Sequence, residues 1–363
     1  MSYTNGLDKP SDYFETKLYT GNAGTLNVTG LDFQPDWVWI KNRTSDYTHG
    51  LYDSVRGAGS SKGIYSNTNE AEGTNSAFQN LTSFNSDGFS LGSTSNTNVI
   101  NTNSQNHVSW NWKAGTSFTN DASSTGIGSI DSAGSVNTDA GFSIVSYTGT
   151  GSAGTVAHGL GAIPKFIIIK GLTNTSAENW RVFHNSTSNG RLVLNETKAA
   201  ANSTDFGANG SGGTITQNLN YFNIGTDARV NGSGQDYIAY LFSEKKGYSK
   251  FSSYIGNGNA DGTFVYTGFK PAFVMVKVTN TTNNWMVFDN KRSDVSGANV
   301  NGNMLRPNLS DAELTDDDLD FLSNGFKWRR NSAGFNGSGN TFIFMCFAEN
   351  PFTTSTGIPT TAR

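Results

Sequence analysis

The side chains best suited to acid–base, metal or thiol chemistry in this chain are four histidines and a single cysteine. The histidines show none of the spacings typical of a zinc site, and none is paired with a recurrent carboxylate. The sequence contains no nucleophile elbow, phosphate-binding loop or CxxC motif. We therefore expect no catalytic, cofactor-binding or metal-binding residues. The five residues are His49, His107, His158, His184 and Cys346.

Paired carboxylates are the remaining route to hydrolysis. Glycoside hydrolysis needs two carboxyl groups about 5–10 Å apart, and the sequence alone cannot place the candidate pairs. Those pairs are Asp53 with Asp87 and Asp289 with Asp320. The acidic run at residues 316–320 is the best candidate for a metal site. It lacks the glycine and the terminal glutamate of a calcium loop, so a solvated turn is the simpler interpretation.

The elements that would position such groups recur three times along the chain. A Tyr-x-Gly landmark begins at Tyr19, Tyr147 and Tyr254, at intervals of 128 and 107 residues. An apolar strand that ends in lysine recurs at intervals of 129 and 107 residues. Three further landmarks follow in the same order each time, which indicates a tandem array of one small β-unit. The strand lysines are Lys41, Lys170 and Lys277.

Two recurring positions carry ionisable side chains. The first is the lysine that ends each apolar strand. Its simpler interpretation is a charge that blocks pairing at a strand edge, and the alternative is a contact that the three units have in common. The second position is interpreted as a surface or turn residue that follows a strand. Its occupants are Asp53, His184 and Asp289.

Composition predicts the fold class. The chain has 363 residues with 42 glycines, 24 phenylalanines, 13 tyrosines and 7 tryptophans, but only 15% charged residues. This pattern is typical of short β-strands joined by polar turns. We expect an all-β protein of three tandem antiparallel β-sandwich (jelly-roll-like) domains. The predicted segments are an N-terminal arm (1–12), repeat 1 (13–114), a Gly/Ser-rich linker (115–140), repeat 2 (141–247), repeat 3 (248–352) and a C-terminal tail (353–363).

The linker and the few helix signals predict differences between the repeats. Residues 115–140 have little that could form a core, so we expect a flexible connection. Repeats 2 and 3 follow each other closely, and we expect them to pack rigidly while repeat 1 is attached more loosely. Helix signals are weak and confined to residues 195–202 and to a turn within residues 307–320, capped by Ser310 or Thr315.

Aromatic residues in the first repeat are the candidates for an interaction surface. Trp37 and Trp39 share one face of a strand whose other face is also apolar. That pattern predicts a strand covered on both sides, or an aromatic face exposed for binding. Trp110 and Trp112 alternate with polar residues in the closing strand of the repeat. Trp180 and Trp285 each share a face with a valine, which predicts core positions.

Charge and hydropathy exclude several classes. A formal net charge of −4 argues against a nucleic-acid-binding protein, which would normally be basic. No apolar run approaches the roughly 20 residues of a membrane span. The first residues lack the basic start and apolar core of a signal peptide, and we expect synthesis in a cytoplasm. Cys346 has no partner for a disulfide within the chain and lies in an apolar strand, so we expect a buried, inert thiol.

A set of short motifs gives the chain a family resemblance. They are Phe222-Asn223-Ile224-Gly225, Asn231-Gly232-Ser233-Gly234, Tyr237-Ile238-Ala239-Tyr240-Leu241-Phe242, Trp285-Met286-Val287-Phe288-Asp289-Asn290, Ser323-Asn324-Gly325-Phe326, Tyr52-Asp53-Ser54-Val55-Arg56-Gly57 and Ser83 to Gly92. With these motifs the chain resembles a repeated β-domain of tail-fibre-like and other virion structural proteins of marine bacteriophages, notably of cyanobacteria. The first repeat departs from the pattern in its closing Trp-Asn-Trp.

The resemblance implies a structural module and supplies no catalytic residues. It implies a non-enzymatic virion protein, made in the host cytoplasm, that contributes to a tail fibre or tail appendage and to host attachment. The implied partners are other virion proteins, further copies in a homo-oligomer, and a host surface glycan or receptor. The alternatives are a capsid decoration protein on the outer shell and a carbohydrate-binding or polysaccharide-degrading protein.

Overall fold

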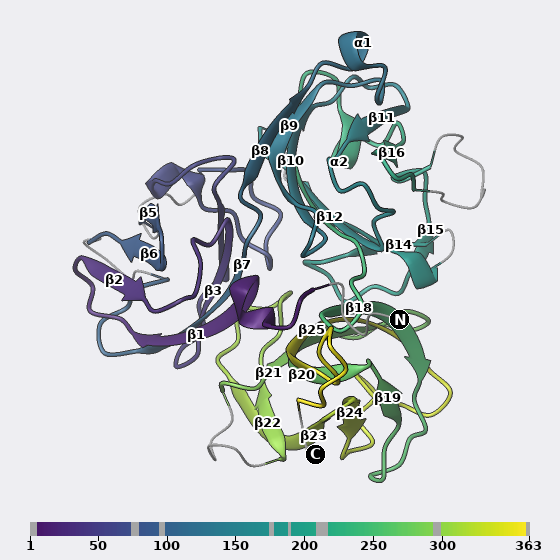
Figure 1. The fold of residues 1–363 in the computed structure, drawn as a ribbon. Coiled ribbons are helices and arrows are strands. Elements are labelled where there is room, and N and C mark those ends of the chain that lie inside the picture. Colours follow the sequence, from purple (N-terminus) through teal and green to yellow (C-terminus); the bar gives the residue numbers. More distant parts are fainter. Residues whose placement is uncertain are drawn as a thin grey trace.

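The computed structural model of the chain describes residues 6–73, 80–93, 99–173, 178–187, 190–207, 217–292 and 299–360 (Figure 1). Within these ranges the protein is almost entirely β-structure, with two four-residue α-helices, α1 (Ala122–Thr125) and α2 (Ala228–Asn231). All paired strands are antiparallel. The predicted all-β antiparallel class is confirmed. We refer to residues 13–114, 115–247 and 248–352 as the first, second and third unit.

The first unit consists of two sheets. One has the strand order β1-β7-β3-β4 and the other the order β2-β6-β5. The 3₁₀ turns η1 (Pro10–Asp12) and η2 (Ser60–Lys62) lie before and within it. The strands are β1 (Phe14–Thr20), β2 (Leu26–Thr29), β3 (Trp37–Asn42), β4 (Gly50–Asp53), β5 (Leu81–Asn85), β6 (Gly88–Leu91) and β7 (Asn106–Trp112).

The second unit contributes to an eight-stranded sheet, β15-β14-β13-β12-β17-β10-β9-β8, and to the pair β11-β16. The 3₁₀ turn η4 (Asn185–Thr187) follows β13. The strands are β8 (Thr116–Asn120), β9 (Ser132–Asn137), β10 (Phe142–Thr148), β11 (Gly154–Ala157), β12 (Phe166–Gly171), β13 (Arg181–His184), β14 (Gly190–Val193), β15 (Ala201–Asn202), β16 (Tyr221–Ile224) and β17 (Asp236–Phe242).

The third unit has two four-stranded sheets, β18-β25-β20-β21 and β19-β24-β23-β22. Its strands are β18 (Ser249–Ile255), β19 (Phe264–Tyr266), β20 (Phe269–Val278), β21 (Met286–Asp289), β22 (Asn301–Met304), β23 (Leu314–Leu322), β24 (Gly325–Trp328) and β25 (Thr341–Pro351). Figure 1 shows the three units as lobes grouped around a common centre.

The central strands β3, β12 and β20 explain why the sequence is apolar on both of their faces. In β3, Val38 and Ile40 pack inside the first unit, while Trp37 and Trp39 face the other units. Strands β12 and β20 divide their side chains in the same way between a core of their own unit and a shared core. Because side chains of a strand alternate between its faces, each of these strands joins two cores.

The shared core joins all three units. Each unit also has a separate core between its own two sheets. Aromatic rings make much of the shared core: Trp37 stacks on Tyr240 of the second unit at 4.3 Å between ring centroids, and Phe14 stacks on Phe347 of the third at 5.1 Å. The first unit is therefore packed as closely as the others, and the expectation of a loose attachment is wrong. The ring of Trp37 lies on the face of β3 that points away from its own unit, so another unit must cover it.

The predicted linker is also wrong, because residues 115–140 are folded. Strand β9 pairs with β10 along its whole length, and β8 pairs with β9. Gly134 allows the close approach between β9 and the carbonyl of Ile144, where a side chain would collide. The aliphatic side chains of Ile130 and Val136 are buried in the core of the second unit. Backbone pairing and two buried side chains thus hold a segment whose composition indicates flexibility.

The two segments with helix signals do not form helices. Residues 195–202 form a turn and strand β15, and residues 307–320 lead into strand β23. In β23, Leu319 and Phe321 are buried opposite Trp328 and Phe326, so the period is two and not that of a helix. The tertiary pairing with β24 therefore overrides the capping signals at Ser310 and Thr315.

Candidate functional site

The recurring strand lysines make the same contact in each unit. Each ammonium group is buried and donates to the backbone carbonyl of a neighbouring unit: Lys41 to Ser310 at 2.9 Å, Lys170 to Asn69 at 2.9 Å, and Lys277 to Thr197 at 3.2 Å. Burial lowers the pKa of Lys41 to about 7, and the pKa values of Lys170 and Lys277 to about 8. Because β3, β12 and β20 are interior strands, edge blocking is the wrong interpretation.

Three equivalent segments supply these carbonyls, and we call residues 65–72, 193–200 and 306–313 the clamp segments. The lysine acceptor is the fifth residue of each segment. The last residue of each segment donates its backbone N–H to the carbonyl two residues after the lysine: Glu72 to Leu172 at 3.0 Å, Ala200 to Thr279 at 2.8 Å, and Glu313 to Arg43 at 3.0 Å. The first clamp grips the second unit, the second grips the third, and the third grips the first. The contacts thus form a closed ring.

The first residue of each clamp segment also accepts a hydrogen bond from the next unit. The indole N–H of Trp180 donates to Tyr65 O at 2.8 Å, and that of Trp285 donates to Val193 O at 2.9 Å. At the third junction the imidazole Nε2 of His49 donates to Arg306 O at 3.0 Å. The core positions predicted for Trp180 and Trp285 are confirmed.

A second ring of contacts uses the position occupied by Asp53, His184 and Asp289. Asp53 accepts from the Tyr240 hydroxyl at 2.7 Å, His184 Nε2 donates to Phe344 O at 3.2 Å, and Asp289 accepts from the Trp110 indole at 2.9 Å. All three side chains are fully buried, so the predicted surface or turn role is wrong. Each one reaches the closing strand of another unit, which a single unit read in isolation cannot show.

Buried ion pairs reinforce this ring at two of the three positions. Asp53 pairs with Arg56 at 2.6 Å, and Asp289 pairs with Arg292 at 2.6 Å. Glutamates of the clamp segments complete both pairs: Glu72 lies 3.0 Å from Arg56, and Glu313 lies 2.8 Å from Arg292. Glu313 also pairs with Arg43 of the first unit at 2.6 Å. Both pairs join residues three apart in the chain, Asp–x–x–Arg, and the fold encloses them between units.

The four tryptophans predicted as an interaction surface lie in the shared core. Trp37, Trp39, Trp110 and Trp112 are all buried. The rings of Trp37, Trp110 and Trp112 contact aromatic rings of the second and third units, whereas the ring of Trp39 contacts Trp37 and Trp110 of its own unit. The prediction of an exposed surface is wrong, because all four rings are covered within the same chain.

The histidines are placed for structure and not for proton transfer. All four are buried, and burial lowers the pKa values of His107, His158 and His184 to about 4 and that of His49 well below its usual range. Their ring nitrogens lie within hydrogen-bonding distance of backbone atoms. Within the described ranges no three His, Cys, Asp or Glu side chains gather as a metal site would require. Cys346 is a buried free cysteine.

The candidate carboxylate pairs are engaged with separate partners. Asp53 is paired with Arg56, whereas Asp87 lies in the β5–β6 turn and accepts from the Gly30 N–H at 3.4 Å. Asp289 is likewise enclosed, whereas Asp320 lies on β23 and pairs with Arg329 at 3.5 Å. Neither pair forms a site with two free carboxylates. The acidic run at residues 316–320 belongs to strand β23 and not to a turn.

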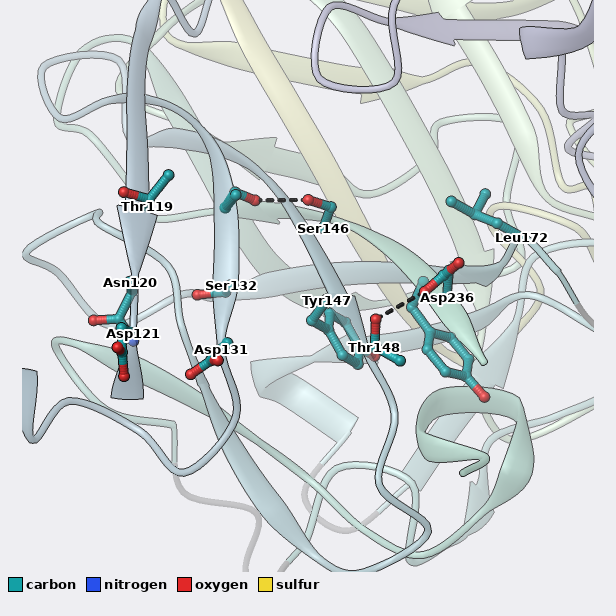
Figure 2. Close-up of a pocket in the computed structure, with 12 residues that line it drawn as sticks. Thr119, Asn120, Asp121, Asp131, Ser132, Ser146, Tyr147, Thr148, Leu172 and Asp236 are labelled. Atoms are coloured by element: carbon teal, nitrogen blue, oxygen red, sulfur yellow. Dashed lines mark hydrogen bonds between the residues drawn. The ribbon is translucent and has the colours of Figure 1, made fainter. Parts of the chain in front are cut away.

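A cleft of about 560 Å³ lies on the outer part of the eight-stranded sheet (Figure 2). Figure 2 shows Asp121 and Asp131 at one side of the cleft and Asp236 at the other, with Ser146 and Thr148 between them. Thr148 donates to Asp236 at 2.8 Å, and Asp131 accepts from the backbone N–H of Ala122 at 2.9 Å. The residues of β8 and β9 form one wall, so the predicted linker builds this cleft.

The lining favours neutral or cationic ligands. It consists of hydroxyl, amide and carboxylate groups with the apolar side chain of Leu172 and contains no lysine or arginine. Tyr147 and Tyr237 line it but are buried, so neither offers a ring face for stacking. The cleft can accept hydrogen bonds from a hydroxyl-rich molecule. The lining residues are Thr119, Asn120, Asp121, Asp131, Ser132, Ala133, Ser146, Tyr147, Thr148, Leu172, Asp236 and Tyr237.

Comparison with known proteins gives one match. The sequence profile of a family described as "Domain of unknown function (DUF7483)" matches residues 9–351, which is nearly the whole chain. Neither the comparison with curated proteins nor that with solved structures gives a match. No helix in the described ranges is long and apolar enough to cross a membrane.

Proposed function

The chain belongs to the DUF7483 family, whose description assigns no activity. From its geometry and from the resemblance of its repeated motifs, we propose that it is a non-enzymatic structural protein of a bacteriophage particle. It contributes to a tail fibre or tail appendage and to host attachment. Its partners are other virion proteins and further copies of itself, and a host surface glycan or receptor is the target of attachment. It is made in the host cytoplasm and resides in the virion.

One observation supports a structural role above the others. The ionisable residues that recur in the three units are all used to hold the units together. Lys41, Lys170 and Lys277 bind backbone carbonyls across the junctions, and Asp53 and Asp289 bind Tyr240 and Trp110. These recurring ionisable groups are therefore enclosed and hydrogen-bonded. The assignment to a phage particle comes from the resemblance of the repeated motifs.

A second candidate, a capsid decoration protein, is favoured by the arrangement of the units. They close around a common centre (Figure 1) instead of extending in a line, so the chain forms a compact three-lobed block. Such a block suits attachment to a shell at least as well as the long reach expected of a fibre. The polar cleft of Figure 2 is the feature that a carbohydrate-binding role would use.

Imaging of tagged particles tests the proposal. The protein is fused to a small electron-dense or fluorescent tag and located on purified particles. We expect the tag on the tail, and a tag on the outer shell would select the decoration role. A purified protein that stays monomeric and is absent from particles would contradict both roles. Release of reducing sugars from host envelope polysaccharide would instead establish an enzyme.

A further inference from the structure

The outer strands β2, β11 and β19 occupy the same place in the three units. Each has a buried valine paired with a buried phenylalanine of the neighbouring strand, which fixes the register. The pairs are Val28 with Phe89, Val156 with Phe222, and Val265 with Phe326. The residues on either side of the valine are therefore equivalent, and they differ: Asn27 and Thr29 in β2, Thr155 and Ala157 in β11, and Phe264 and Tyr266 in β19.

The second unit covers the free edge of its outer strand with its own chain. The backbone N–H of Thr155 donates to Ser129 Oγ at 2.9 Å. The Thr155 carbonyl accepts from the N–H groups of Ser129 and Ile130 at 2.8 and 3.1 Å, and the Ala157 carbonyl accepts from Ser132 Oγ at 3.1 Å. The Ile130 side chain enters the core of the unit. Residues 129–132, inside the predicted linker, thus act as an added strand.

The third unit has no such segment of its own chain. Only residues 243–248 connect β17 to β18, which is too short for a covering strand. Trp328 N–H donates to Thr263 O at 3.2 Å, and Thr267 N–H donates to Asn324 O at 3.0 Å. Because hydrogen bonding alternates along an antiparallel strand, the backbone groups of Phe264 and Tyr266 face away from β24. Within the ranges that the structure describes, no residue bonds to them.

The side chains beside this edge are apolar and exposed. Phe264 is 44% exposed and Tyr266 is 60% exposed. Natural proteins protect a free edge with a very short strand or with charged side chains, and β19 is short, with three residues, but carries no charged side chain. In the first unit the edge of β2 is flanked by polar side chains, and Lys17 Nζ binds Gly30 O at 3.3 Å next to it. The third unit instead presents two aromatic rings, the residue type that dominates binding energy at protein interfaces.

A cleft of about 270 Å³ continues the edge toward β18. It is lined by Gly268, which is equivalent to Gly159 of the second unit, by Phe352, which is 43% exposed, and by polar and charged residues. The charged residues are Glu244, Lys246 and Lys250. In the second unit, Val136 and Phe118 of strands β9 and β8 lie against Gly159. The cleft of the third unit therefore lies at the place that the β8–β9 hairpin fills in the second unit. Glu244, which lines the cleft, already has a partner on β18: its carboxylate accepts from the backbone N–H of Phe251 at 3.2 Å.

We propose that the third unit binds an extended strand of a partner protein along β19 and into this cleft, as residues 129–137 cover the second unit. The partner segment carries small residues, glycine or serine, where it passes the edge, and one aliphatic side chain that enters the cleft. Main-chain hydrogen bonds to Phe264 and Tyr266 provide affinity, and the two rings provide contact area. This site is independent of whether the particle carries the protein on its tail or its shell.

A tethered copy of the covering segment tests the site. Residues 126–138 are fused behind Arg363 through a Gly/Ser linker of about 15 residues, which spans roughly 20 Å. Phe352 borders the cleft, so the C-terminal segment starts beside it. The Thr155 N–H, which is equivalent to the Phe264 N–H, donates to Ser129 Oγ in the second unit. The expected result is therefore that the amide hydrogen exchange of Phe264 slows by about fivefold at the effective concentration of a short tether. Unchanged exchange at Phe264 would overturn the proposal.

Two substitutions make the test specific. Tyr266→Pro removes an N–H that faces the free edge, and we expect Phe264 to lose its added protection in the fusion. Tyr266→Ala, the residue that the second unit has at this position, should lower the protection while leaving the fold unchanged. Thr29→Pro in β2 is the matched control and should have no effect. Equal protection in the Tyr266→Pro fusion would contradict strand addition.

Other occupants give different results. A mixture of common neutral and acidic pyranoses at about 10 mM, about tenfold above a 1 mM dissociation constant, is added to the unfused protein. Slowed exchange at Phe264 with the sugars but not with the tethered segment would replace the proposal by a saccharide site. Sedimentation of the unfused protein as a dimer that Tyr266→Pro abolishes would make a second copy the occupant and would also overturn it.

Discussion

The inner sheets and the outer strands of this protein follow opposite rules. On the inner side, one position holds the same residue in all three units: Lys41, Lys170 and Lys277 donate to equivalent clamp carbonyls. On the outer side, the positions beside the shared valine hold a different residue in each unit, such as Thr29, Ala157 and Tyr266. The lysine is the same in each unit because it makes the same contact in each unit. Among the described residues, the side chains at these outer positions make no hydrogen bond that the three units share.

The largest effect should follow a truncation in the shared core. Trp37 contacts rings of the first and second units, so Trp37→Ala should lower the free energy of unfolding by about 3–5 kcal/mol. Urea denaturation followed by circular dichroism measures it. The matched outer-face variant is Phe264→Thr, with an expected loss below about 0.5 kcal/mol. Similar losses for the two variants would erase the distinction between inner and outer positions.

A smaller loss should follow removal of one clamp contact. Lys277→Met keeps the side-chain length but leaves the half-buried carbonyl of Thr197 and the buried carbonyl of Val278 without this donor. We expect a loss of about 1–3 kcal/mol in unfolding free energy. Lys198→Met changes an exposed lysine of the second clamp segment and should cost almost nothing. If both lysines behave alike, the ring of lysine contacts does not stabilise the junctions.

Acid should weaken the junction between the second and third units. Burial holds the pKa of His184 at about 4, against about 6.5 in the unfolded chain. The neutral imidazole therefore contributes stability that is present above pH 6.5 and lost as the pH falls from 6.5 toward 4. His184→Gln should reduce the slope of unfolding free energy over this window by about 1 kcal/mol per pH unit. An unchanged slope in denaturation series at several pH values would contradict this role.

The smallest effect is expected at the outer edge of the third unit. Tyr266→Ala installs the residue that the second unit has in the same register, so unfolding free energy should change by less than about 0.5 kcal/mol. Thermal denaturation measures the change. A loss above about 2 kcal/mol would mean that Tyr266 is part of the fold, and its exposure would then not indicate a binding surface.

The sequence predicted well what depends on period and repetition. The three apolar strands ending in Lys41, Lys170 and Lys277 lie where the repeat places them, and the all-β class follows from the same pattern. It could not predict the junctions, because the clamp acceptors are backbone carbonyls and carry no residue signature. The burial of Trp37 depends on Tyr240, about 200 residues later in the chain. For the same reason the pairing of residues 115–140 with β10 was hidden by a composition typical of linkers.

Differential scanning calorimetry tests most directly whether the three units form one body joined by the shared core. A single transition is expected, with a calorimetric enthalpy equal to the van't Hoff enthalpy, a ratio of about 1. Trp37→Ala should shift that transition as a whole to lower temperature. Two or three separate transitions, with a ratio of about 2 or more and only the first unit affected by the substitution, would contradict the account.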